Sequence, residues 1–172
     1  MHDSFQLSNK YEKTSFAFDS TSAESGLSEF SFVLENTGLE KLWNYGDSNV
    51  FVTYDALIDG ARTSITETPS YYSSSNISIE CDGTTGGELP SGNWTISQII
   101  GDRLDPGLIN SNEKAEIVTK LSYPLYNATS TISLTFASDV GQTQTISFDT
   151  DDSDCAWYNP NWLSRELIRI NH

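Results

Sequence analysis

The residues that most often do chemistry in proteins are scarce or badly placed in this sequence. Its histidines, His2 and His172, stand at opposite ends of a chain of 172 residues. A serine or cysteine triad needs a histidine beside its nucleophile, and a three-histidine metal site needs one more. The sequence also lacks a glycine-rich phosphate loop with its lysine and a dinucleotide-binding fingerprint. It therefore predicts a protein that is not an enzyme, with no catalytic residues and no cofactor.

Carboxylates are the other candidates for chemistry. The acidic run from Asp149 to Asp154 offers the oxygen ligands that calcium prefers, but it lacks the glycine and final glutamate of an EF-hand loop. Close carboxylate pairs, which glycosidases use, are expected by chance among 24 acidic residues and so indicate nothing. We interpret the run as a solvated linker and predict no metal site.

The balance of charge limits the partners. With 24 acidic and 9 basic side chains the chain carries a net charge of −15 at neutral pH. This field repels nucleic acid and anionic lipid and favours cations or basic surfaces, although a merely solubilising or salt-adapted surface explains it too. We predict no nucleic-acid partner.

The composition also indicates a compartment. Frequent serine and threonine with few lysines and arginines are typical of sheets that face water outside the cell. No run of about 18 apolar residues is present, and Met1 to Phe5 lacks the apolar stretch of a signal peptide. We expect an extracellular position on the cell envelope, with membrane contact only through an N-terminal anchor that this sequence lacks.

Cysteines and sequons are the candidate sites of covalent modification. Cys81 and Cys155 can form one disulfide or remain separate thiols, because sequence alone does not bring their Cβ atoms together. Asn-x-Ser/Thr sequons occur at Asn76, Asn93 and Asn127, about as many as chance predicts. Their positions at or near predicted loops allow glycosylation without requiring it.

Alternating apolar residues predict strands along most of the chain. Within residues 28–35, Phe30, Phe32 and Leu34 share one face, and an Asn-Thr-Gly turn follows. The run from Val50 to Tyr54 is dense in β-branched and aromatic residues and predicts a strand buried on both faces. Further strands are expected at 61–66, 93–100, 113–121, 131–136 and 142–148.

This spacing of strands predicts the fold and the domain organisation. Seven or eight mostly antiparallel strands favour an all-β, immunoglobulin-like sandwich. We divide the chain into an N-terminal stalk or edge strand over residues 1–26, a sandwich domain over 27–150 and a C-terminal tail over 151–172. The tail allows a short amphipathic helix.

The tail also holds the candidate protein interface. Large aromatic side chains beside arginine are common interface anchors. The candidates are Trp157, Tyr158, Trp162 and Arg165. The alternative is that these side chains seal the domain's own core.

Several short motifs follow one another in a defined order. They are Glu35-Asn36-Thr37-Gly38, Val50 to Tyr54, Trp94-Thr95-Ile96, the segment from Leu104 to Asn110, and Glu113 to Ile117. Over about residues 28–148 their order resembles the soluble domains of the archaellum accessory proteins FlaF and FlaG. The resemblance implies an immunoglobulin-like sandwich, held outside the membrane by an N-terminal helix, in the stator of the motor. It also implies self-association and contact with a related sandwich subunit and with surface-layer protein.

We therefore predict a non-catalytic extracytoplasmic binding or scaffold domain. An archaellin or pilin-like filament head has a similar sandwich pattern and is the nearest alternative. A carbohydrate-binding module is the second. Exposed, coplanar Trp43 and Trp94 in one cleft would support it, and burial of both would remove it. The turn over residues 105–110 is expected to be structural, because Pro106 and Gly107 already explain it.

Overall fold

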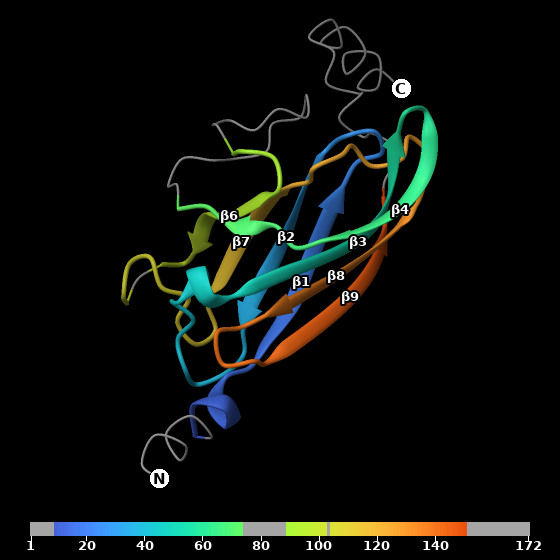
Figure 1. Ribbon diagram of the computed structural model, residues 1–172. Helices are drawn as coiled ribbons and strands as arrows, with labels where there is room; N and C mark the ends of the chain where they lie inside the picture. Colours follow the sequence, from blue (N-terminus) through green and yellow to red (C-terminus); the bar gives the residue numbers. More distant parts are fainter. Residues whose placement is uncertain (1–8, 74–88, 103, 151–172) are drawn as a thin grey trace, which may run out of the picture.

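The computed structural model describes residues 9–73, 89–102 and 104–150, and this part of the chain folds into two packed β-sheets (Figure 1). Their strands are β1 (Phe16–Ala23), β2 (Glu29–Asn36), β3 (Asn49–Ile58), β4 (Ala61–Glu67), β5 (Ser70–Tyr71), β6 (Asn93–Ile100), β7 (Lys114–Lys120), β8 (Thr131–Ala137) and β9 (Thr143–Asp149), with a 3-10 turn, η1 (Tyr45–Asp47), before β3. None of the described helical segments is long and apolar enough to cross a bilayer.

The strand order identifies the fold. One sheet has the order β1-β2-β7-β6-β5 and the other β4-β3-β8-β9, and every pairing is antiparallel except that of β5 with β6. With the two-residue β5 set aside, these are the A-B-E-D and C′-C-F-G sheets of an immunoglobulin-like sandwich. The predicted all-β, immunoglobulin-like class is confirmed. The helix expected in the tail lies outside the described residues.

Alternation of side chains produces the core between the sheets. Along β3, Val50, Val52 and Tyr54 point inward and are almost fully buried, and β2 and β8 follow the same period of two. Trp94 from β6 closes the core against Phe136 of β8, with ring centroids 6.0 Å apart. The alternation explains why β2, β3 and β8 could be recognised from sequence.

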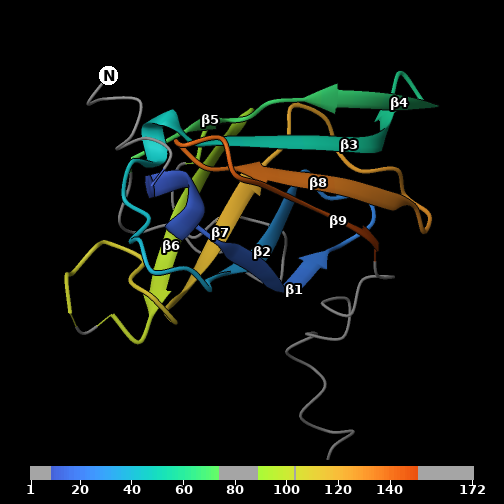
Figure 2. The ribbon, with the colours of Figure 1, turned by 90° about the horizontal axis from the view of Figure 1, so that it is seen from below.

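The prediction that the 50–54 strand is buried on both faces is wrong. Phe51 is 41% exposed, because the outer face of the four-stranded sheet has no layer of described residues over it. Figure 2, which looks along the sandwich, shows two layers, with β4, β3, β8 and β9 on one side and the second sheet on the other. Each layer therefore buries one face.

The two ends of the sandwich differ in their connections. One end, which we call the loop end, consists of residues 9–15, 37–48, 101–102, 104–113 and 138–142. It holds the helical turn over residues 9–13 and the two long connections that leave β2 and β6 (Figure 1). The last described residues, after β9, lie at the opposite end. The chain thus runs from one end of the sandwich to the other.

Candidate functional site

The loop end is built on a contact between its two long connections. Leu42 and Ile109 form an isolated antiparallel bridge, in which each N–H donates to the other residue's carbonyl over 3.0 Å. These residues come from segments that follow β2 and β6, which are not neighbours in their sheet. The bridge holds the two connections together, and we call these two bridged connections the frame.

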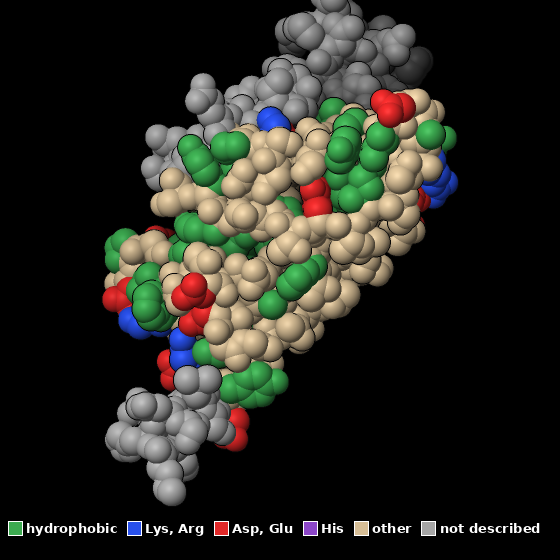
Figure 3. Space-filling model, in the orientation of Figure 1, with side chains coloured by type: hydrophobic (Ala, Val, Ile, Leu, Met, Phe, Trp, Pro, Cys, Tyr) green, Lys and Arg blue, Asp and Glu red, His purple; other side chains and the backbone are tan. Residues whose placement is uncertain are grey.

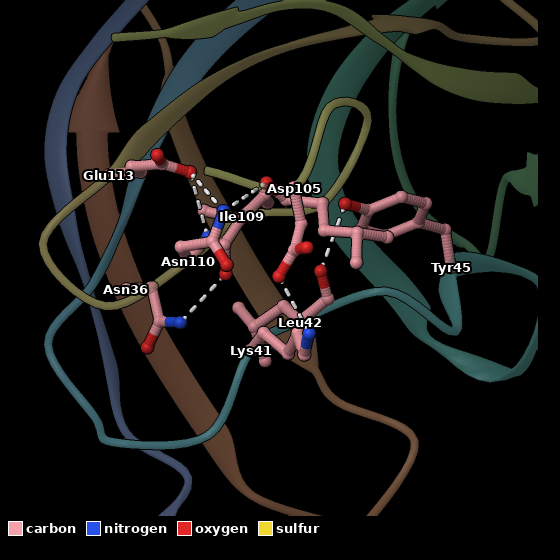
Figure 4. Close-up of polar contacts among 9 residues, drawn as sticks. Asn36, Lys41, Leu42, Tyr45, Asp105, Ile109, Asn110 and Glu113 are labelled. Carbon is pink, nitrogen blue, oxygen red and sulfur yellow. Dashed lines mark hydrogen bonds and ion pairs between the residues drawn. The ribbon is translucent and has the colours of Figure 1, made fainter. Parts of the chain in front are cut away.

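Asn36, at the end of β2, is the central polar residue of this frame (Figure 4). Its side chain is fully buried, and its Nδ2 donates to the carbonyls of Glu40 and Ile109, both over 2.8 Å. Its Oδ1 accepts the N–H of Gly38 over 3.0 Å. Because an unpaired buried amide is costly, this satisfied set explains why asparagine stands here.

Gly38 lets the chain pass close to the start of β1. The N–H groups of Thr37 and Gly38 both donate to the carbonyl of Ser15, over 3.0 and 2.9 Å. A Cβ at position 38 would lie 2.5 Å from two backbone atoms, the carbonyl oxygen of Lys13 and the nitrogen of Ser15. Only glycine fits that approach, so the Asn-Thr-Gly motif joins three segments of the loop end.

The second connection is held by its own polar contacts. Glu113 Oε2 accepts hydrogen bonds from the backbone N–H and the side-chain Nδ2 of Asn110, each over 2.9 Å. Gly107 has a φ of +84° in the turn that begins at Asp105, and the Asp105 carboxylate pairs with Lys41 over 2.7 Å. The Asp-Pro-Gly loop is therefore a turn with a structural role, as the sequence predicts, and it also bonds to the first connection.

The hydroxyl of Tyr45 offers a hydrogen bond to each of the two connections. Its hydroxyl lies 2.9 Å from the carbonyl of Leu42 and 3.1 Å from that of Gly107, and it can donate to either. Burial of the phenol raises the pKa of Tyr45 well above its usual range, since the charged form would lose its hydration. The pKa of Tyr54, whose hydroxyl donates to Glu67, is raised mainly by burial as well.

The raised pKa of the buried Tyr45 phenol leads to a prediction about stability at alkaline pH. A phenol whose pKa is raised by folding stabilises the protein below the unfolded-state pKa of about 10, and this contribution is lost as the pH rises through the folded-state pKa. Between about pH 9 and about pH 11, on either side of that reference, wild type should lose more unfolding free energy than Tyr45→Phe. Urea titrations of both proteins at the two pH values measure it. Equal losses would contradict a buried phenol at position 45.

The frame exposes apolar side chains to solvent. Leu39 is 79% exposed, Leu104 76% and Trp43 54%, and all three stand on the two bridged connections. Lys10, from the helical turn, lies 5.8 Å from the centre of the Trp43 ring and pairs with Asp139 over 2.6 Å. In Figure 3 the loops on the left of this end show hydrophobic side chains beside acidic and basic ones.

This arrangement suits binding of a protein. Tryptophan is a common anchor of protein interfaces, and apolar side chains that are exposed together often mark a protein-binding surface. Among the described residues, no three histidine, cysteine, aspartate or glutamate side chains lie close enough together to hold a metal ion. We take the exposed residues of the loop end as the candidate functional site.

The paired tryptophans of a sugar-binding cleft are not formed. Trp94 is completely buried in the core, whereas Trp43 is exposed at the loop end. A sugar ring needs aromatic faces that it can reach, and Trp94 offers none. Trp43 and Trp94 therefore do not form the cleft that would have supported the carbohydrate-binding alternative.

Most of the residues singled out from the sequence lie outside the described part of the chain. These are Trp157, Tyr158, Trp162, Arg165, Asn76, Cys81 and Cys155. The other two sequons are described and differ. The side chain of Asn93 donates to the carbonyls of Pro90 and Ser91, and Thr95 of the same sequon is buried, whereas Asn127 is exposed in an irregular segment. Asn127 is thus the better presented of the two.

The loop-end anchors were missed from the sequence. Leu39 and Leu104 lie in turn segments, where no periodicity tells an exposed apolar residue from a buried one. One signal was available. Leu39, Lys41 and Trp43 occupy every second position directly after the glycine turn, away from any predicted core strand.

The fold and the loop end define a class: an immunoglobulin-like sandwich with an apolar, braced loop surface. No protein-family model matches the sequence, and no curated protein matches it significantly. Several chains of solved structures are similar, and two of these structures are given below. One is the archaellum periplasmic stator protein FlaG from Sulfolobus acidocaldarius, at 16% identity over 78% of this chain and 99% of that one, with a TM-score of 0.49.

The other similar structure is the archaellum periplasmic stator protein complex FlaF and FlaG from Sulfolobus acidocaldarius. It matches at 17% identity over 77% of this chain and 87% of that one, with a TM-score of 0.50. The resemblance to stator proteins that the motif order predicted is confirmed at the level of the fold.

Proposed function

We propose that this chain is a non-catalytic binding and scaffold domain on the outer side of the cell envelope. In this proposal it serves in an archaellum stator, associates with itself and with a related sandwich subunit, and contacts the surface layer. The observation that carries the proposal is the exposure of Leu39, Trp43 and Leu104 on the braced loop end. The similarity of the fold to that of a stator protein complex supports it.

In this proposal the two ends of the sandwich meet different partners, and the direction of the chain is the reason for the choice. An N-terminal anchor of the kind implied by the resemblance would hold the loop end toward the membrane, because residue 9 lies there. The loop end would then meet a neighbouring stator subunit. The opposite end, which carries the exposed Tyr123, would face outward to the surface layer.

Binding measurements with two probes test this assignment. The first probe is the soluble domain of a FlaF- or FlaG-type protein from the same organism, and the second is its isolated surface-layer protein. Trp43→Ala should weaken binding of the sandwich probe about 30-fold, the effect of losing an interface anchor worth about 2 kcal/mol. Tyr123→Ala is the matched control, since it removes an exposed aromatic from the opposite end.

The outcomes separate the parts of the proposal. Loss of surface-layer binding in Trp43→Ala with none in Tyr123→Ala would reverse the orientation. If wild type bound neither probe, the stator assignment would be wrong, and the filament-head alternative would become the better one.

A further inference from the structure

β9 lies at an edge of the four-stranded sheet. It pairs with β8 on one side, and no described strand pairs with its other side. An unpaired edge presents backbone N–H and C=O groups to which another strand can add. β1 lies close to β9 but belongs to the opposite sheet, where it pairs with β2 (Figure 2).

The other three edges of the sandwich carry features that discourage pairing. β1 has a register shift between Phe18 and Ser20 and carries Asp19 at that point. β5 has two residues. β4 carries Arg62, which pairs with Asp55, and ends at Glu67. Bulges, short length and charge are the usual protections of an edge, and none of them is found in β9 before its last residue, Asp149.

The hydrogen bonds next to β9 show which of its backbone groups face outward. Ser138 N donates to Gln142 O, and Thr150 N donates to Ser130 O, so the bonded pairs on this ladder are those with even numbers. Bonded and non-bonded pairs alternate in an antiparallel ladder. The backbone groups of Thr143, Thr145 and Ser147 therefore point away from β8.

The side chains along this edge are neutral from Thr143 to Phe148, and Asp149 follows at the end of the strand. Thr143, Thr145 and Ser147 are exposed on the outer face, and Thr145 shares a 2.7 Å hydrogen bond with Thr135 of β8. In Figure 3 the lower right margin of the molecule, where Figure 1 places β9, is tan, the colour of uncharged polar side chains and backbone. On a chain of net charge −15, such an edge is a place where two copies can approach without bringing carboxylates together.

We propose that β9 pairs with β9 of a second copy of this chain, antiparallel across a two-fold axis. This inference rests on the self-association in the proposed function and names its site. With Thr145 opposite Ser147 of the other copy, Asp149 lies opposite Thr143, and the two Asp149 side chains are far apart. A parallel pairing in register would set Asp149 against Asp149, which is unfavourable. The antiparallel pair joins the two four-stranded sheets into one continuous sheet.

The salt dependence of binding distinguishes a second copy of this chain from a basic partner. Two copies with a charge of −15 each repel at a distance, and raising the salt from about 0.1 M to about 1 M shortens the Debye length from about 10 Å to about 3 Å. The homodimer should therefore tighten as salt rises. Binding of a basic strand at the same edge would weaken over that range.

Sedimentation equilibrium of the full chain, in a salt series, tests the proposal. Thr145→Pro removes an outward N–H without breaking a bond to β8, and it should weaken dimerisation at least tenfold. Thr145→Glu, which adds a like charge to both edges, should have the same effect and serves if the proline variant fails to fold. Ser64→Pro and Ser64→Glu on the β4 edge are the matched controls and should leave the dimer unchanged.

Each result has a defined meaning. Dimers that survive both Thr145 substitutions, or a wild type that stays monomeric at high salt, would overturn the β9 interface. Neither result bears on the two-probe binding measurements, so the scaffold function can stand when this inference fails.

Discussion

Replacing Gly38 by alanine should lower the free energy of unfolding by roughly 3 kcal/mol or more, near the upper end for overpacking a fixed site. The new methyl group would lie 2.5 Å from the Lys13 carbonyl oxygen and from the Ser15 nitrogen. Both are backbone atoms, so no side chain can rotate away to make room. Urea-induced unfolding followed by circular dichroism measures the loss.

Gly46→Ala is the control for this substitution. Gly46 lies in η1, and a Cβ there would have no atom within 4 Å. Its unfolding free energy should stay within about 0.5 kcal/mol of wild type, as for most surface substitutions. If Gly38→Ala behaved like Gly46→Ala, the close approach of the first connection to β1 would be wrong.

Asn36→Ala should cost about 3 kcal/mol in unfolding free energy, because it removes three buried hydrogen bonds at about 1 kcal/mol each. These are the bonds that the side chain donates to the Glu40 and Ile109 carbonyls and the bond that it accepts from the Gly38 N–H. The same urea titration applies. Asn127→Ala, at an exposed asparagine, should change little.

Asn36→Asp adds a pH test of the same site. A carboxylate there would face two carbonyl oxygens in place of the amide donor. Burial and these acceptors disfavour the charged form, so the folded-state pKa of the new group is raised and its stability falls as pH rises through the unfolded value. The free energy of unfolding of Asn36→Asp should therefore be lower at neutral pH than in acid. A pH-independent cost would contradict the donor role of Nδ2.

The sandwich was predictable where one face of a strand is buried and the other wet. β2, β3 and β8 obey this alternation, and their segments were recognised from residues such as Phe30, Phe32 and Leu34. The parallel pairing of β5 was not predictable, because Ser70 and Tyr71 are too few to form a pattern and follow Pro69. The two-sided burial expected at Val50 to Tyr54 failed because a dense apolar run does not reveal how many layers the fold has.

The loop end was predictable only in part. Its motifs were recognised as turns, and glycine and proline account for them locally. Their contact with each other was hidden, since Asn36 and Ile109 are 73 residues apart in the chain. Whether Leu39 and Leu104 are anchors or core depends on that contact, and no local pattern records it.

The course of the chain from the loop end to the opposite end has a mechanical consequence. β1 leaves the loop end and β9 arrives at the far end, so a pull between residues 9 and 150 acts along the strands. The hydrogen bonds of an antiparallel ladder lie across that direction. Tension would then load the bonds of β1 with β2, and of β9 with β8, together in shear, instead of opening them one after another. In the proposed stator role, this arrangement would help the domain to stay folded under tension.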